Sequence, residues 1–160
     1  RLGPARVHHC MRAIGSCEVL IGLMVERASN RVSFGKRLNE FSSVQDAVSE
    51  SRLELEQARL LVQRTAFRLD RDGNRAIRKD VSLIKIAVAR AYYNIANRGI
   101  QIFGAMGMTN DAPFAAAMAH ARAFRIFDGP DEVHHRTVYR LEERERQGED
   151  LWSSYVHPPS

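Results

Sequence analysis

The strongest constraint on the fold is a long stretch of helical periodicity in residues 44–69. Apolar or small side chains recur there every three or four positions, at Val44, Val48, Ser51, Leu55, Ala58, Val62, Thr65 and Leu69. This spacing places them on one face of an α-helix of about seven turns. The alternation of apolar and polar residues that marks a strand is not sustained anywhere, so the pattern predicts an all-α protein.

Further helices are predicted on both sides of this segment. The helix 78–103 has an inner stripe formed by Val81, Ile84, Val88, Tyr92, Ile95, Gly99 and Ile102. The helix 4–30 turns inward Val7, Met11, Ile14, Ile21, Met24 and Ala28. A fourth long helix is expected over 130–146 and a shorter one over 113–124. Because the connections are short, we expect an antiparallel four-helix bundle.

The length of 160 residues is that of a single domain with a sizeable core. The sequence starts at Arg1 instead of a methionine, and we expect it to be a piece of a longer polypeptide. Residues 1–150 are predicted to form the helical domain, and residues 151–160 a loose tail. No apolar run approaches the roughly 20 residues that cross a bilayer, so no membrane span is expected.

The two cysteines, Cys10 and Cys17, are predicted to be buried thiols. Seven residues of helix separate them by roughly 10 Å along the axis, which is too far for a disulfide. Such thiols fit a reducing compartment. We expect the cytoplasm if the source is bacterial, and otherwise an organelle interior such as the mitochondrial matrix or the peroxisome.

The net charge of +5 raises the question of nucleic acid binding. Basic residues are interleaved with acidic ones, as in residues 142–146, where glutamates and arginines are mixed. Mixing of this kind is typical of a solvated helix face instead of a stripe that follows phosphates. We therefore expect no nucleic acid partner.

Two of the breaks between helices combine glycine with groups that bind cofactors. The break at 31–38 contains Arg31, Phe34 and Gly35, which either end a helix or clamp a phosphate and stack on a flat ring. The break at 101–109 contains Gly104 and Gly107, which end a helix or let backbone amides approach a ligand. No strand precedes these glycines, so they are not a dinucleotide fingerprint.

The third break, at 127–135, contains the best candidate for a catalytic group. Asp131 and Glu132 fall in the first turn of the last helix, where the helix dipole favours negative charge. Asp128 precedes Gly129 outside the helix, and a carboxylate there can act as a general base in a dry pocket. The competing interpretation is a metal site built from Asp128, Asp131, Glu132, His134 and His135. We expect no metal, because no second ligand cluster complements these residues except His8 and His9, which the sequence does not place.

Taken in this order, the three breaks resemble motifs of the acyl-CoA dehydrogenase family. Residues 31–35 resemble its R-x-x-F-G element, and residues 101–107 resemble its Q-x-x-G-G-x-G element. Residues 127–129 resemble its Y-E-G-T element, which contains the catalytic base. The resemblance extends from residue 6 to about residue 144 and implies the C-terminal helical domain of that family.

The resemblance implies an FAD-dependent enzyme that introduces a double bond between the α and β carbons of an acyl-CoA thioester, as in fatty-acid oxidation. In this family a carboxylate removes the α-proton while a hydride leaves the β-carbon for the flavin. Electron-transferring flavoprotein is the implied acceptor. A homo-oligomer, a dimer or tetramer assembled around this domain, is also implied, and the domain alone is expected to be inactive.

The resemblance also assigns roles to individual residues. Asp128 is the candidate catalytic base, and the candidate substrate contacts are Arg6 and Gly129. The candidate cofactor contacts are Arg31, Phe34, Ser42, Gln101, Gly104, Ala105 and Glu132. Of these, Arg31 and Phe34 are expected to meet a flavin bound mainly by a neighbouring subunit.

Several residues depart from the pattern of the family. Asp128 is one methylene shorter than the usual glutamate, and Pro130 replaces a threonine, which removes a hydroxyl and a backbone N–H. Ser42, Ala105 and Glu132 stand where glutamine, glycine and glutamine are common. We therefore expect a branch of the family that handles unusual acyl chains. The alternative is a helical module that serves oligomerisation or interaction without catalysis.

Overall fold

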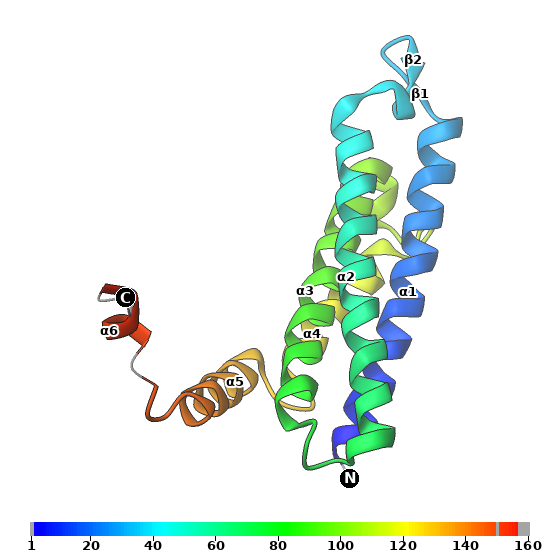
Figure 1. The fold of residues 1–160 in the computed structure, drawn as a ribbon. Helices are drawn as coiled ribbons and strands as arrows, with labels where there is room; N and C mark the ends of the chain where they lie inside the picture. Colours follow the sequence, from blue (N-terminus) through cyan, green and yellow to red (C-terminus); the bar gives the residue numbers. More distant parts are fainter. Residues whose placement is uncertain (1, 150, 157–160) are drawn as a thin grey trace.

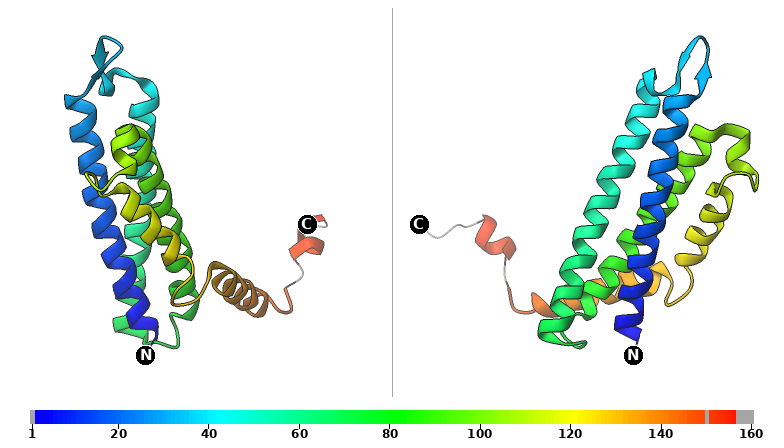
Figure 2. Two further views of the ribbon diagram at one scale, coloured as in Figure 1. Left: turned by 180° about the vertical axis from the view of Figure 1, so that it is seen from behind. Right: turned by 90° about the vertical axis from the view of Figure 1, so that its right-hand side faces the viewer.

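The computed structural model describes residues 2–149 and 151–156, and it confirms an all-α antiparallel four-helix bundle (Figure 1). The bundle consists of α1 (Leu2–Asn30), α2 (Ser42–Asp72), α3 (Arg78–Phe103) and α4 (Phe114–Phe124). Helices α1 and α3 run in one direction, and α2 and α4 run in the other (Figure 2). Within the described residues, no helix is long and apolar enough to cross a membrane.

Helix α3 is the centre of the bundle, because it packs against α1, α2 and α4 and also against the following helix α5 (Asp131–Glu145). Every residue predicted for its inner stripe is buried. Contacts on several sides also bury polar residues of α3, namely Asp80, Ser82 and Lys85. The predicted stripe of α2 is confirmed as well, since its members are either buried or packed against the core.

The prediction for α1 is only partly right. Val7, Ile21, Met24 and Ala28 are buried, but Met11 is 52% exposed. The buried positions between them are instead Cys10, Ala13, Cys17 and Leu20. Met11 lies one position beyond this stripe, and a helix turns by about 100° per residue, so its side chain points outward.

The connection between α1 and α2 is more ordered than the sequence predicts. Strands β1 (Val32–Ser33) and β2 (Lys36–Arg37) form a short antiparallel hairpin, followed by the 3-10 helix η1 (Leu38–Glu40). Two-residue strands are too short to show an alternating pattern. A second 3-10 helix, η2 (Gly104–Met108), continues from the end of α3.

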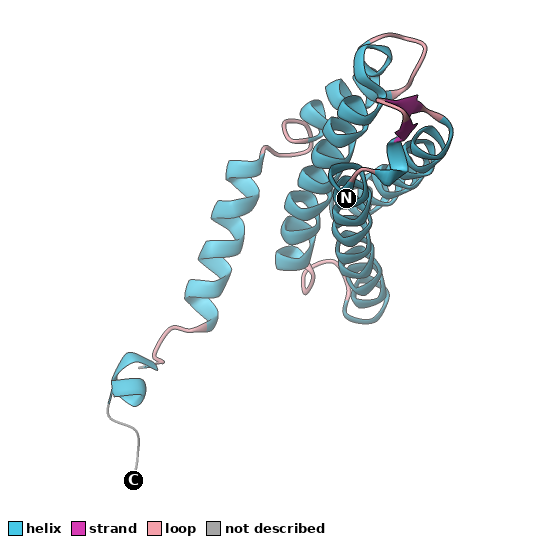
Figure 3. Cartoon of the chain, turned by 90° about the horizontal axis from the view of Figure 1, so that it is seen from above, coloured by secondary structure: helices cyan, strands magenta, loops and turns pink. Residues whose placement is uncertain are grey.

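The last part of the chain leaves the bundle. Helix α5 packs on α3 and then runs outward, followed by the short helix α6 (Leu151–Val156) (Figure 3). The short helix α4, and not the longer α5, therefore supplies the fourth member of the bundle. The composition of α5 explains this, since Asp131 and His134 are its only buried residues in the described chain. Residues 157–160 of the expected tail lie outside the described residues.

Candidate active site at the turn between α4 and α5

Asp128 and Gly129 form the turn that connects α4 to α5. Asp128 has a φ of 57° and Gly129 a φ of 102°. A non-glycine residue in the left-handed region costs about 1–3 kcal/mol and persists only where its surroundings hold it. A side chain at Gly129 would have its Cβ 2.9 Å from Nε2 of His134, so both the backbone conformation and the close approach of His134 favour glycine there.

Arg6 of α1 holds this turn from one side. Its Nε donates a hydrogen bond to the backbone carbonyl oxygen of Asp128 at 2.8 Å. Its guanidinium also lies 3.5 Å from the position that a Cβ of Gly129 would take. The structure therefore brings together Arg6, Asp128 and Gly129, the three residues expected at the base and the substrate.

The carboxylate of Asp128 faces His9, one turn further along α1. Nε2 of His9 lies 3.4 Å from Oδ2 of Asp128. The His9 ring also packs edge-on against Phe127, with their centroids 6.0 Å apart. The Asp128 side chain keeps 31% of its surface exposed in this chain, so the turn is open on one side.

His134 lies beneath the turn, in the first half of α5. Its Nδ1 is 3.3 Å from Oγ of Ser82, while its Nε2 is buried with no hydrogen-bond partner among residues 2–149 and 151–156. Burial, and then the charge of Arg6, lower the pKa of His134 below its ordinary value. The neutral imidazole is thus the favoured form at neutral pH.

Two of the residues considered as possible metal ligands, Asp131 and His135, each contact a different arginine. Asp131 accepts a hydrogen bond from Nε of Arg125 at 2.6 Å, which closes the turn. His135 meets Arg90 instead, with 3.0 Å between Nε2 and the guanidinium. In the part of the chain that the structure describes, no three or more His, Cys, Asp or Glu side chains gather to hold a metal ion.

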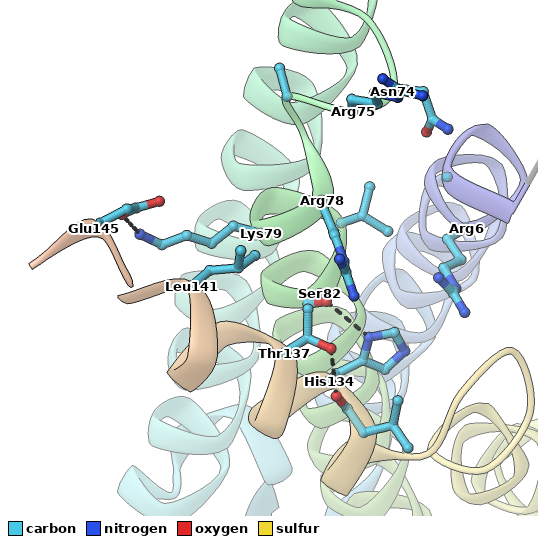
Figure 4. A pocket seen from close by; sticks show the side chains of 14 residues that line it. Arg6, Asn74, Arg75, Arg78, Lys79, Ser82, His134, Thr137, Leu141 and Glu145 are labelled. Atoms are coloured by element: carbon cyan, nitrogen blue, oxygen red, sulfur yellow. Dashed lines mark hydrogen bonds and ion pairs between the residues drawn. The ribbon is translucent and has the colours of Figure 1, made fainter. Parts of the chain in front are cut away.

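A cavity of about 860 Å³ adjoins the turn (Figure 4). It lies between the start of α1, the α2–α3 connection, the first turns of α3, and α5. Figure 4 shows Arg6, Arg78 and His134 extending toward the same space from three helices. Of its charged lining residues, Arg6, Arg75 and Arg78 are cationic. Lys79 also lines the cavity, but its ammonium group is paired with the carboxylates of Glu142 and Glu145. Such a lining is suited to anionic groups of a ligand.

The predicted cofactor residues gather at the other end of the bundle. Arg31 follows α1, Phe34 is at the tip of the hairpin, and Ser42 opens α2. Phe34 is 96% exposed and has a φ of 51°. Across from them, the exposed residues at the end of α3 are Gln101, Gly104 and Ala105.

The end of α1, next to the hairpin, contacts the end of α3, whereas the turn between α4 and α5 lies at the opposite end of α1. The guanidinium of Arg27 lies 5.4 Å from the centroid of the Phe103 ring, which joins the end of α1 to the end of α3. From Arg6 to Asn30, α1 spans about 36 Å at 1.5 Å per residue. Six of the seven predicted cofactor residues therefore lie far from Asp128. Glu132, which is exposed in the first turn of α5, is the exception.

Three residues at the turn were not predicted as parts of the catalytic site. His9 and His134 entered the sequence interpretation only as possible metal ligands. Lys85, which is buried and donates to two carbonyls of the turn, had no role in the sequence-based prediction. One signal could have found it, since a lysine between Ile84 and Ile86 stands out in an apolar helix.

Comparison with known proteins decides the family. Residues 1–141 match the family model described as "Acyl-CoA dehydrogenase, C-terminal domain". The chain belongs to the acyl-CoA dehydrogenase family. It is 48% identical over 142 residues to "Probable acyl-CoA dehydrogenase FadE2" of Mycobacterium tuberculosis, a match that covers 89% of this chain and 35% of that protein.

Solved structures share the fold of this domain. Butyryl-CoA dehydrogenase from Megasphaera elsdenii superposes with a TM-score of 0.82 at 26% identity, covering 88% of this chain and 36% of the other. The FAD complex of PigA superposes with a TM-score of 0.77 at 25% identity, covering 82% of this chain and 34% of the other. The chain thus spans about a third of the length of these relatives.

Proposed function

We propose that this chain is the C-terminal domain of an FAD-dependent enzyme that dehydrogenates an acyl-CoA thioester between its α and β carbons. Within that enzyme, the domain supplies Asp128 as the base, part of the FAD site and the oligomer interface. The observation that carries this proposal is the left-handed turn at Asp128, which Arg6 holds beside a cationic cavity.

A base that removes a proton from a weakly acidic C–H bond has to be shielded from water. A carboxylate becomes a stronger base when water is excluded from it. In this chain the Asp128 side chain is still partly exposed. We infer that other parts of the full-length protein cover this side of the turn, and that Gly129 lies against the thioester. The cationic cavity next to it suits the phosphate groups of coenzyme A.

The opposite end of the bundle fits a flavin nucleotide. Phe34 offers an exposed aromatic face for a flat ring, and Arg31 beside it offers a cation for a phosphate. Gly104, with a φ of 64°, opens a turn where backbone amides can approach a ligand, and Gln101 and Ala105 flank it. A bound flavin would supply the hydride acceptor of the reaction.

The separation between the two ends supports a site shared between subunits. Because about 36 Å of α1 lies between Arg6 and Asn30, one flavin does not reach both the hairpin and Asp128 of the same chain. We infer a homo-oligomer in which Arg31, Phe34 and Ser42 contact the flavin of a neighbour, while Glu132 lies near the flavin opposite Asp128. The FAD complex of PigA supports FAD as the cofactor.

The remaining assignments follow from the family. Electron-transferring flavoprotein is the proposed acceptor, and the two buried thiols suit the proposed reducing compartment, which is the cytoplasm, the mitochondrial matrix or the peroxisome. The replacement of glutamate by Asp128 shortens the base by one methylene, which favours an acyl chain of unusual shape.

The proposal is tested by comparing the full-length polypeptide with this chain alone. We expect flavin absorbance and acyl-CoA-dependent bleaching only in the full-length protein, and a panel of acyl-CoA thioesters would define the chain length and substituents. A full-length protein that purifies without flavin and does not bind it would instead favour a module that serves assembly alone.

A further inference from the structure

Lys85 is an unusual residue for the centre of a helical bundle, because its side chain is only 1% exposed. A lysine is seldom buried unless its ammonium group finds partners. Nζ of Lys85 donates hydrogen bonds to the carbonyl oxygen of Phe124 at 2.7 Å and to that of Phe127 at 3.1 Å. The partners of this ammonium are therefore backbone atoms of the segment that leads into the turn.

Aromatic rings complete the surroundings of the ammonium group. Nζ lies 4.1 Å from the centroid of the Phe124 ring and 5.0 Å from that of Phe127. Both distances are within the range of cation–π attraction. The two residues whose carbonyls accept from Lys85 thus also cover it with their rings, so the segment and the lysine hold each other in place.

The contacts of Lys85 fall on the segment that immediately precedes Asp128. Phe124 ends α4, and Phe127 immediately precedes Asp128, so Lys85 fixes the backbone at both ends of a four-residue segment before the base. Arg6 fixes the next carbonyl, that of Asp128 itself. Helices α3 and α1 therefore hold three carbonyls of one turn from two sides.

Such contacts can maintain the strained conformation of Asp128. Its φ of 57° is unfavourable for a residue with a Cβ, and a left-handed residue persists where the surrounding structure over-determines it. The direction of the Asp128 side chain follows from this backbone conformation. A displacement of about 1 Å in a catalytic group can lower a rate by about 10²-fold.

We propose that Lys85 is a positioning residue that holds the Asp128 turn in the geometry needed for removal of the α-proton. The inference rests on the proposed role of Asp128 as the base. Lys85 does not touch the substrate in this account. It acts through the backbone carbonyls of Phe124 and Phe127.

The test uses the full-length enzyme with Lys85→Met, which retains the apolar length of the side chain but cannot donate. We expect kcat to fall by about 10- to 100-fold, with flavin content unchanged and KM changed by less than about threefold. The deuterium isotope effect on α-deuterated acyl-CoA should increase, because proton removal becomes slower. Lys85→Gln, which keeps an uncharged NH2 donor group on a shorter side chain, should give an intermediate rate and serves if the methionine variant does not fold.

A stability-matched control separates positioning from a general effect on folding. Val62→Ala removes two methyl groups from a residue that is 1% exposed and lies on α2, a helix that packs mainly against α1 and α3. It should lower the melting temperature without changing kcat or the isotope effect. If Lys85→Met behaves like Val62→Ala, the lysine is a structural residue only and the inference is wrong.

A double-variant cycle tests the route of action. If Lys85 acts through Asp128, then Asp128→Asn with Lys85→Met should turn over within about threefold of Asp128→Asn alone. A further loss comparable to that of Lys85→Met in the native background would overturn the inference. Failure of the proposed function is a separate result, since Asp128→Asn alone would then retain its turnover.

Discussion

Arg6 and Asp128 are 122 residues apart in the chain, and the Nε of Arg6 donates a hydrogen bond to the carbonyl oxygen of Asp128 at 2.8 Å. This bond joins the start of α1 to the turn between α4 and α5. It also brings a guanidinium of the cationic cavity into contact with the backbone of the proposed base. The first turns of α1 are thus part of the candidate site and not only of the bundle.

Arg6→Met is predicted to loosen this turn. Loss of a half-buried hydrogen bond with a charged donor should lower the free energy of unfolding of this chain by about 1–3 kcal/mol. Urea unfolding at neutral pH measures the change. Arg12→Met is the matched control, because Arg12 is exposed on the same helix. Equal losses for both variants would contradict a specific role for the bond to Asp128.

Gly129→Ala is predicted to be destabilising for two reasons. Its φ of 102° is unfavourable for alanine, and the new Cβ would lie 2.9 Å from Nε2 of His134. We expect the free energy of unfolding to fall by about 1–3 kcal/mol or more. Gly35→Ala provides the comparison, because Gly35 has a φ of 79° but a Cβ added there would meet no atom within 4 Å. Thermal unfolding should show the smaller loss for Gly35→Ala, and the opposite order would argue against close packing at Gly129.

Glu18 is predicted to stabilise the folded chain at neutral pH and to lose this contribution in acid. The hydrogen bond from Arg52, and then that from Arg59, hold the pKa of Glu18 at about 2, below its ordinary value of 4.5. Because the folded pKa is depressed, the contribution is present above pH 4.5 and is lost as the pH falls toward about 2. The difference in unfolding free energy between the native chain and Glu18→Gln should therefore shrink over that range. A difference that does not change with pH would refute this.

The thiols of Cys10 and Cys17 are predicted to be unreactive in the folded chain. Burial raises the pKa of each from 9.0 to about 12, so both remain protonated at pH 8. Because the folded pKa is raised, their contribution to stability is complete below pH 9 and is lost as the pH rises toward about 12. A chromogenic disulfide reagent at pH 8 should label the urea-unfolded chain quickly and the native chain only at the rate of opening. Rapid labelling of the native chain would contradict this burial.

The sequence was a good guide to those parts of the fold in which apolar side chains repeat. The stripes of α2 and α3 are buried as predicted, because helical spacing alone decides which of their residues share a face. The place of α5 was not predictable in this way. Its helical propensity is clear, but its sequence does not show that it leaves the bundle after its first turns.

Some residues of the candidate site could likewise be predicted from the sequence, and others could not. The order of the three glycine-containing breaks pointed to Asp128 and Gly129 through their resemblance to a family, and the comparisons confirm that family. Lys85, His9 and His134 reach the turn only after three helices have packed. The partners of Lys85 are backbone carbonyls, which every residue has, so no pattern of side chains could have indicated them.

The most direct test of the central claim is the rate of flavin bleaching by acyl-CoA in the full-length enzyme with Asp128→Asn. Asparagine keeps the shape of the side chain but cannot accept the α-proton as a carboxylate does. The account predicts that flavin stays bound while the bleaching rate falls by a factor on the order of 10²–10⁴, the usual contribution of a general base. An Asp128→Asn enzyme that bleaches its flavin at the native rate would contradict the assignment of Asp128 as the base.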